Sequence, residues 1–186
     1  MKEAKPADIY QLKITLQDIR PPIWRRVQVS SDVTLAKLHR IIQEVMGWFD
    51  SHLHQFIVDR AYYGTPDSEA SYEIRNEKKV KLSELPLKPK AKFLYEYDFG
   101  DGWEHKILLE DILQPKPDVR YPVCIGGERA CPPEDCGGVP GYADFLEAIR
   151  NPDHEEHEET LEWIGGEFDP EAFDLEAVNL GLRRIR

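Results

Sequence analysis

Residues 95–105 of this chain combine carboxylates, glycines, a tryptophan and a histidine, the residue types that could do chemistry at one site. The segment reads Tyr-Glu-Tyr-Asp-Phe-Gly-Asp-Gly-Trp-Glu-His and has the pattern of a β-hairpin with a tight turn. Carboxylates beside a histidine suit general acid/base catalysis or metal-assisted hydrolysis. The residues that could form such a site are Asp98, Asp101, Glu104 and His105, which could combine with Glu134 and Asp135.

The alternation of side chains predicts how the two strands of this hairpin pair. A three-residue loop, Gly100-Asp101-Gly102, sets Phe99 opposite Trp103 and Tyr97 opposite His105. Only this register, and not that of a two-residue loop, gathers the aromatic residues on one face. We therefore predict a type I turn followed by a glycine in the left-handed conformation.

The other face of the predicted hairpin carries acids. Asp98 and Glu104 would lie directly opposite each other, where like charges destabilise a strand pair unless a cation, a basic partner or solvent compensates them. Aspartate is also common in turns for structural reasons alone. The prolines and glycines of residues 132–142 predict an ordered loop that lines the same surface. The predicted binding-surface residues are Asp98, Asp101, Trp103, Glu104, His105, Glu134 and Asp135.

Three cysteines crowd into one short segment and could bind a metal. Cys124, Cys131 and Cys136, with His105 as the fourth ligand, offer the thiolate and imidazole groups that zinc prefers. Their spacing does not match the compact pairs of common zinc modules, and free cysteines also pack as small apolar groups. Zinc is thus a possible cofactor, and no other cofactor is indicated. An odd number of clustered cysteines is not typical of a secreted disulfide scaffold.

The remaining histidines carry weaker signals. His52 and His54 share one face of a predicted strand and could hold a metal, but two ligands without a third more often pack or face solvent. His39 has polar neighbours and is expected in solvent. His154 and His157 are spaced i, i+3 rather than the i, i+4 of a zincin, so we predict a solvated acidic helix there.

Hydrophobic periodicity predicts the elements that position these residues. Strands are expected at 9–16, 24–29, 52–58, 92–98 and 103–111, shorter extended pieces at 72–75 and 79–82, and a loop at 61–72. Helices are expected at 35–46, 141–150, 153–164 and 174–182. This order predicts an α+β fold, a β-grasp-like mixed sheet of four or more strands with one helix across it. We predict one domain, 1–186, in which a glycine-, proline- and cysteine-rich loop and acidic helices (118–186) pack on a sheet-and-helix core (1–117).

Charge is distributed unevenly, which bears on partners. The net charge is −11, and residues 67–186 hold fifteen Lys or Arg against twenty-eight Asp or Glu, so this part repels a phosphate backbone. DNA contact would need the N-terminal basic residues, although a solvated rim is favoured. They are Arg20, Arg25, Arg26, Lys37 and Arg40. A protein partner is therefore expected rather than nucleic acid. Without a membrane-length apolar run or a signal-peptide pattern, we expect a cytoplasmic protein.

Several segments together resemble one known family. They are Ile19–Arg26, Tyr97–His105, Pro132–Tyr142, Phe168–Pro170, Phe173, Asp174 and Asn179. They are similar to the family typified by open reading frame three of a root-inducing plasmid, and the resemblance covers nearly the whole chain. It implies an α+β domain without an established activity. Some members are labelled insertion-element passengers or transposon resolvases, but this chain lacks the serine-nucleophile context and basic tail of a serine resolvase.

Three functions remain open at this point. The favoured hypothesis is a non-catalytic binding module, with a link to mobile elements, whose ligand surface is the hairpin turn and the glycine/proline loop. One alternative is a metal-dependent hydrolase that uses Asp98, Asp101, Glu104 and His105. The other is a DNA-associated accessory protein that uses the N-terminal arginines.

Overall fold

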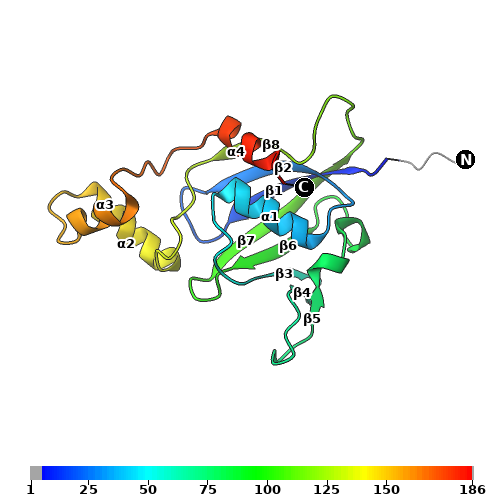
Figure 1. The fold of residues 1–186 in the computed structure, drawn as a ribbon, viewed down its shortest axis with the longest axis horizontal. Coiled ribbons are helices and arrows are strands. Elements are labelled where there is room, and N and C mark those ends of the chain that lie inside the picture. Colours follow the sequence, from blue (N-terminus) through cyan, green and yellow to red (C-terminus); the bar gives the residue numbers. More distant parts are fainter. Residues whose placement is uncertain (1–5, 186) are drawn as a thin grey trace, which may run out of the picture.

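The structure is a computed structural model that describes residues 6–185, and within them the strands form one mixed sheet (Figure 1). The order is β5-β4-β3-β6-β7-β1-β2-β8, and all neighbours are antiparallel except β4 and β5. The strands are β1 (Ile9–Leu16), β2 (Trp24–Ser30), β3 (His54–Val58), β4 (Ala61–Gly64), β5 (Ile74–Asn76), β6 (Lys92–Tyr97), β7 (Trp103–Leu113) and β8 (Val123–Glu128).

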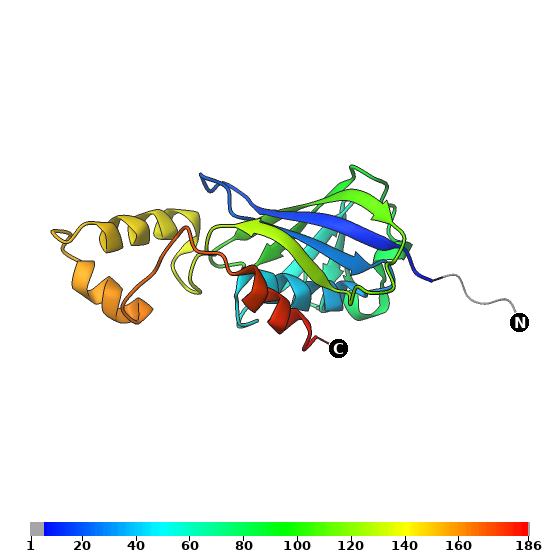
Figure 2. The ribbon, with the colours of Figure 1, turned by 90° about the horizontal axis from the view of Figure 1, so that it is seen from above.

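Helices cover one face of this sheet. The helices are α1 (Leu35–Met46), α2 (Gly138–Arg150), α3 (His157–Ile164) and α4 (Leu175–Leu182), with two short 3-10 helices, η1 (Glu77–Lys79) and η2 (Leu82–Glu84). Figure 2 shows α1 and α4 beneath the same face, whereas α2 and α3 extend beyond one end of the sheet. The long connection between β4 and β5 projects from an edge (Figure 1).

The sequence explains why α1 lies across the sheet. Alternation in β1 sends Tyr10, Leu12, Ile14 and Leu16 to the side covered by α1, and polar residues after Ile9 to the other. Helix α1 presents an apolar face to them, begins at the capping side chain of Thr34 and ends at a left-handed glycine. The predicted α+β architecture with a mixed sheet is confirmed.

Some predicted elements differ from the structure. Residues 61–72 include a strand, β4. Of residues 79–82, Lys79 and Leu82 belong to 3-10 helices, and Lys81 forms an isolated bridge with Thr34. Strand β8 lies in the cysteine-rich stretch, where the sequence shows no alternation. The acidic helix begins at His157, four residues later than predicted. Within residues 6–185, no helix is both long and apolar enough to cross a membrane.

The hairpin register is also different. Tyr97 pairs with Trp103 and Tyr95 with His105, so the turn has five residues, 98–102, and not three. Asp98 is left-handed, with φ 57°, and its backbone N–H donates to Leu53 O in the segment before β3, so the turn begins at Asp98 rather than at Gly100. Because the register differs by two residues, the predicted aromatic face survives. Gly102 is left-handed as predicted, with φ 68°.

Candidate functional site

Two of the predicted surface residues, Trp103 and His105, lie inside the protein. They are 1% and 0% exposed. His105 Nδ1 lies 3.1 Å from Trp103 O and 3.3 Å from Tyr95 O. Burial lowers the pKa of His105 to about 4, so the ring is neutral at pH 7.

The predicted acid/base set of Asp98, Asp101, Glu104 and His105 is therefore not assembled. Successive residues of β7 point to opposite faces, so Glu104 is exposed on one side while His105 is enclosed on the other. Glu104 also lies opposite Glu96 and not opposite Asp98. Asp98 is instead the first residue of the turn.

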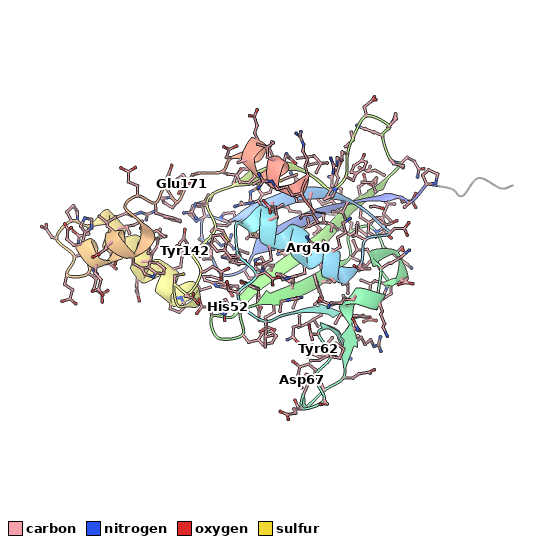
Figure 3. All side chains as sticks on the ribbon, in the orientation of Figure 1. Arg40, His52, Tyr62, Asp67, Tyr142 and Glu171 are labelled. Carbon is pink, nitrogen blue, oxygen red and sulfur yellow. The ribbon has the colours of Figure 1, made fainter. Side chains whose placement is uncertain are left out.

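A different histidine joins the hairpin turn to the proline-rich loop. His52 Nε2 lies 2.9 Å from Asp135 Oδ1, 3.5 Å from Asp98 Oδ2 and 3.6 Å from Glu134 Oε2. We call these four residues the His52 cluster. Three of its members were predicted from the sequence to share one site. Figure 3 places His52 at the end of the sheet nearest α2.

Hydrogen bonds hold Glu134 in the His52 cluster. The hydroxyl of Tyr97 donates to Glu134 Oε1 at 2.9 Å, and the backbone N–H of Phe49 donates to the same oxygen at 2.8 Å. Ser51 N–H donates in turn to the Tyr97 hydroxyl. Burial and the bond to Glu134 raise the pKa of Tyr97, so its hydroxyl stays a donor.

The hairpin turn and the proline-rich loop are built against each other. Asp98 Oδ1 accepts the N–H groups of Gly100 and Asp101, and Asp101 Oδ2 accepts Gly137 N–H at 3.1 Å. A side chain at Gly138 would collide with Asp101 O, so glycine permits this close approach. The predicted proximity of loop and turn is confirmed.

The predicted zinc cluster of Cys124, Cys131, Cys136 and His105 is not formed. Within residues 6–185, no three of these donors lie within 4.8 Å of one another. The three thiols are free, and burial raises the pKa of each, to about 12 for Cys136. Cys124 N–H donates to Asn179 Oδ1, which links β8 to α4. Packing is the role that this structure gives to the cysteines.

A second histidine group lies between α1 and β3. The prediction that His39 faces solvent is wrong, since it is 4% exposed and stacks on His54 with ring centroids 3.5 Å apart. His39 Nδ1 lies 2.8 Å from the Tyr95 hydroxyl and Nε2 lies 2.8 Å from Asp50 Oδ1. His54 Nε2 lies 2.8 Å from Glu77 Oε2. His52 and His54 therefore belong to different groups and do not share a metal.

These stacked histidines lie beside an open pocket of about 570 Å³. Its walls come from α1, from residues 50–55, from the β4–β5 connection with η1, and from Phe99 of the hairpin turn. Asp67 lies near the tip of that connection (Figure 3). Leu53 and Phe99 line the pocket while remaining 68% and 48% exposed. Burial, and then the neighbouring His54, lowers the pKa of His39, so a neutral ring faces this region.

The arginines proposed for DNA contact include two that the fold uses. Arg25 is 2% exposed and donates hydrogen bonds to four carbonyls, those of Trp24, Val45, Glu128 and Arg129. Arg26 forms a bidentate pair with Glu110 at 2.7 and 2.9 Å. Neither guanidinium is free to bind a phosphate, whereas Arg20 and Arg40 are exposed.

The histidines of the acidic helix also have structural roles. His157 Nδ1 lies 2.8 Å from Ala148 O and so joins α3 to α2. His154 lies before α3 and its Nδ1 accepts Glu156 N–H. The i, i+3 spacing of these histidines, which differs from that of a zincin, is consistent with these structural roles.

The fold and the site define an α+β protein with helices on one face of a mixed sheet and two histidine–carboxylate groups, one between α1 and β3 and one at the hairpin turn. Residues 8–177 match the family described as Plasmid pRiA4b ORF-3-like protein, and the chain belongs to that family. This is the family that the sequence motifs resemble.

Two relatives agree with this assignment. The chain is 39% identical over 175 residues to uncharacterized protein y4hQ of Sinorhizobium fredii (strain NBRC 101917 / NGR234), covering 93% of this chain and 90% of that protein. It is 44% identical to the crystal structure of a protein of unknown function, MM3350, from Methanosarcina mazei Go1, with a TM-score of 0.84. That match covers 92% of this chain and 98% of the other.

Proposed function

We propose that this protein is a non-catalytic binding module that captures a segment of a partner protein in the pocket beside α1. The observation that carries the proposal is the pair of exposed apolar side chains, Leu53 and Phe99, on the wall of a cavity of about 570 Å³. Exposed apolar groups that adjoin a concave site are typical of binding surfaces. The ligand surface thus lies next to the hairpin turn rather than on its buried aromatic face.

The pocket wall favours a peptide side chain as the occupant. The stacked pair His39 and His54 lines it, each ring already held by a carboxylate, and Leu53 and Phe99 add apolar surface. Apolar surface with a few fixed polar groups suits an apolar or aromatic anchor residue. Arg40 and Lys78 line the same pocket as Asp50, Asp67 and Glu77, so no single charge dominates it.

A protein partner also fits the charge of the chain better than DNA does. The net charge is −11, and the predicted basic surface loses Arg25 and Arg26 to internal hydrogen bonds. Counterion release by exposed Lys and Arg supplies most non-specific DNA affinity, and this chain offers little of it. The link to mobile elements is supported only by the plasmid in the family's description. As a finer description of the fold, we propose a β-grasp-like arrangement, supported by the order strand–strand–helix–strand.

Panning of a displayed random-peptide library against the full chain tests this proposal. We expect enriched peptides to share an apolar anchor residue and to lose binding to Leu53→Ser and Phe99→Ser. Leu180→Ser is the matched control, because Leu180 is 55% exposed on α4 and does not line this pocket. Failure to enrich any peptide, or equal loss of binding in the Leu180 variant, would contradict a peptide-binding pocket.

A further inference from the structure

The His52 cluster contains a buried nitrogen that has carboxylates around it but no hydrogen-bond partner. His52 Nε2 is closed to solvent, and none of the described residues hydrogen-bonds to it. Asp135 Oδ1 is near, at 2.9 Å, but lies at an angle unsuited to a hydrogen bond. A buried polar atom left in this state is rare in folded proteins and calls for an explanation such as a bound ion.

The distances within the cluster lie within about 0.2 Å of those between ligands of one metal ion. Two ligand atoms about 2.1 Å from one ion, with an angle of 90 to 109° at the ion, lie about 3.0 to 3.4 Å from each other. The ion then lies on the lone-pair axis of the imidazole nitrogen, so the other ligand atoms lie off that axis, where an N–H could not donate to them. The three oxygens lie 2.9, 3.5 and 3.6 Å from His52 Nε2. The ligand atoms of His52, Asp98 and Asp135 all lie within 4.8 Å of one another.

The charges in the cluster point to a cation. Its three carboxylates have one ion-pair partner among the described residues, His52 itself, which adds at most one positive charge. The Asp98 side chain is only 10% exposed, and its Oδ2 faces His52 while Oδ1 accepts two backbone N–H groups. The Glu134 side chain is 14% exposed, so these two carboxylates are partly shielded from solvent, whereas Asp135 is 69% exposed. Like charges gathered in this way repel one another, and a divalent cation would offset that repulsion.

We propose that His52, Asp98 and Asp135 bind one divalent transition-metal ion, with Glu134 as a further oxygen donor. An imidazole combined with carboxylates suits Zn²⁺ or Mn²⁺, whereas Ca²⁺ and Mg²⁺ prefer oxygen ligands alone. Tyr97 and Phe49 N–H, which hold Glu134, would act as outer-shell partners of the ion. The site requires no contribution from the cysteines.

The other histidine group, His39, Asp50 and His54, is less suited to a metal even though its donor atoms are as close together. Its two rings are stacked 3.5 Å apart with planes only 4° from parallel. An imidazole binds a metal in its own ring plane, so one ion cannot lie in both planes at once. Both nitrogens of His39 also have partners already, the Tyr95 hydroxyl and Asp50. The His52 cluster is therefore the better of the two candidates.

This inference does not rest on the proposed peptide-binding function, because metal binding is measured with the ion alone. The test is titration of the chelator-treated full chain with ZnCl₂ by calorimetry and with Mn²⁺ by electron paramagnetic resonance. Mn²⁺ favours oxygen donors over thiolates, so it separates this site from the cysteines. We expect about one ion per chain, bound at least tenfold more weakly by Asp135→Asn and by His52→Gln.

Matched controls make the result decisive. Asp118→Asn changes an exposed aspartate elsewhere, and His154→Gln changes a histidine outside the cluster, so both should bind the ion within about twofold of the unmodified chain. The Asp135 side chain is 69% exposed, and asparagine also tolerates its left-handed backbone, so the Asp135 variant should fold. Absence of saturable binding, or equal affinity in the Asp135 and Asp118 variants, would overturn the proposal. Loss of Zn²⁺ binding only on replacing cysteines would overturn it as well.

Discussion

The Arg25 and His52 regions both bury polar atoms of ionisable side chains, but they differ in the hydrogen bonds that those atoms make. Around Arg25, the guanidinium donates to four backbone carbonyls and its face lies 4.4 Å from the ring of Phe173. Around His52, a buried nitrogen meets three carboxylates and makes no hydrogen bond within the described residues. One region is complete without a ligand, whereas the other has donor atoms that a ligand could use.

The comparison indicates which kind of buried charge stabilises the fold and which kind marks a binding site. Arg25 connects β2, β8 and the end of α1, so its hydrogen bonds hold the sheet and the helix together. The His52 cluster connects only the turn and loops at one end of the sheet. Buried polar groups that are fully hydrogen-bonded rigidify a protein. Buried polar groups without a hydrogen bond lower its stability, and they are found where a ligand binds or a reaction takes place.

Replacement of Arg25 should have the largest effect on stability. In Arg25→Met, four carbonyls lose a donor, and we expect unfolding free energy to fall by about 3 kcal/mol or more. Urea unfolding followed by circular dichroism measures the change. Arg40→Met alters an exposed arginine and should stay within about 0.5 kcal/mol. A loss below about 1 kcal/mol for Arg25→Met would contradict the structural role assigned to this residue.

His105 predicts a dependence of stability on pH. Its pKa is about 4 in the folded protein, below the value of about 6.5 expected on unfolding, so the unfolded chain binds more protons in between. The stability from its neutral form is present above about pH 6.5 and is lost as the pH falls toward 4. Between pH 7 and pH 5 we expect a loss of about 2 kcal/mol.

His105→Asn isolates this contribution, because the amide can still donate to a carbonyl but does not titrate. Urea unfolding at pH 7 and pH 5 measures the stability lost between the two pH values. We expect this loss to be about 2 kcal/mol smaller in the variant than in the unmodified chain. The lowered pKa of His39 acts in the same direction and should remain in both proteins. Equal pH dependence in the two proteins would mean that the ring of His105 is not excluded from solvent.

Tyr97 should have an intermediate effect. Tyr97→Phe removes the hydroxyl that donates to Glu134 and accepts from Ser51 N–H, so we expect a loss of about 1 kcal/mol of stability. If Glu134 helps to hold an ion, Mn²⁺ affinity should also fall by about tenfold. Tyr62→Phe alters a half-buried tyrosine on β4, the strand between β3 and β5, and should leave Mn²⁺ affinity unchanged. Unchanged affinity in both variants would remove Glu134 from the site.

Asp135→Asn should have the smallest effect on stability. In the presence of a chelator, we expect the unfolding free energy to change by no more than about 0.5 kcal/mol, because the Asp135 side chain is mostly exposed and the substitution removes one of several like charges. The same variant is expected to lose most of its affinity for metal. Thermal unfolding with and without Mn²⁺ measures both effects. A large destabilisation in chelator would show that the His52 cluster, like the Arg25 region, is structural.

Much of the framework could be predicted from the sequence because its elements follow local rules. Alternation identified β1, and the apolar spacing with Gly47 at its end identified α1. Strand β8 was not predicted, since its two consecutive glycines interrupt any alternation. The hairpin register was wrong because Asp98 is left-handed and bonds to Leu53 O, a contact distant in sequence, so the turn begins two residues earlier than predicted.

The site was predictable only in part, for the same reason. Asp98, Glu134 and Asp135 were grouped correctly, since a rigid loop and a carboxylate-rich turn were both recognisable in the sequence. His52 was paired with His54 instead, because strand alternation says nothing of what faces a side chain across space. The burial of His39 could have been predicted, because it follows Leu35 by four residues and so lies on the buried face of α1. Its polar neighbours in the sequence obscured this pattern.

The central claim, that the His52 cluster is a ligand site, is tested most directly by crystals grown with Zn²⁺ and measured at the zinc absorption edge. The account predicts one strong anomalous peak about 2.1 Å from His52 Nε2, with oxygens of Asp98 and Asp135 at similar distance. A peak at the cysteines with none at His52, or no ordered zinc at all, would contradict it.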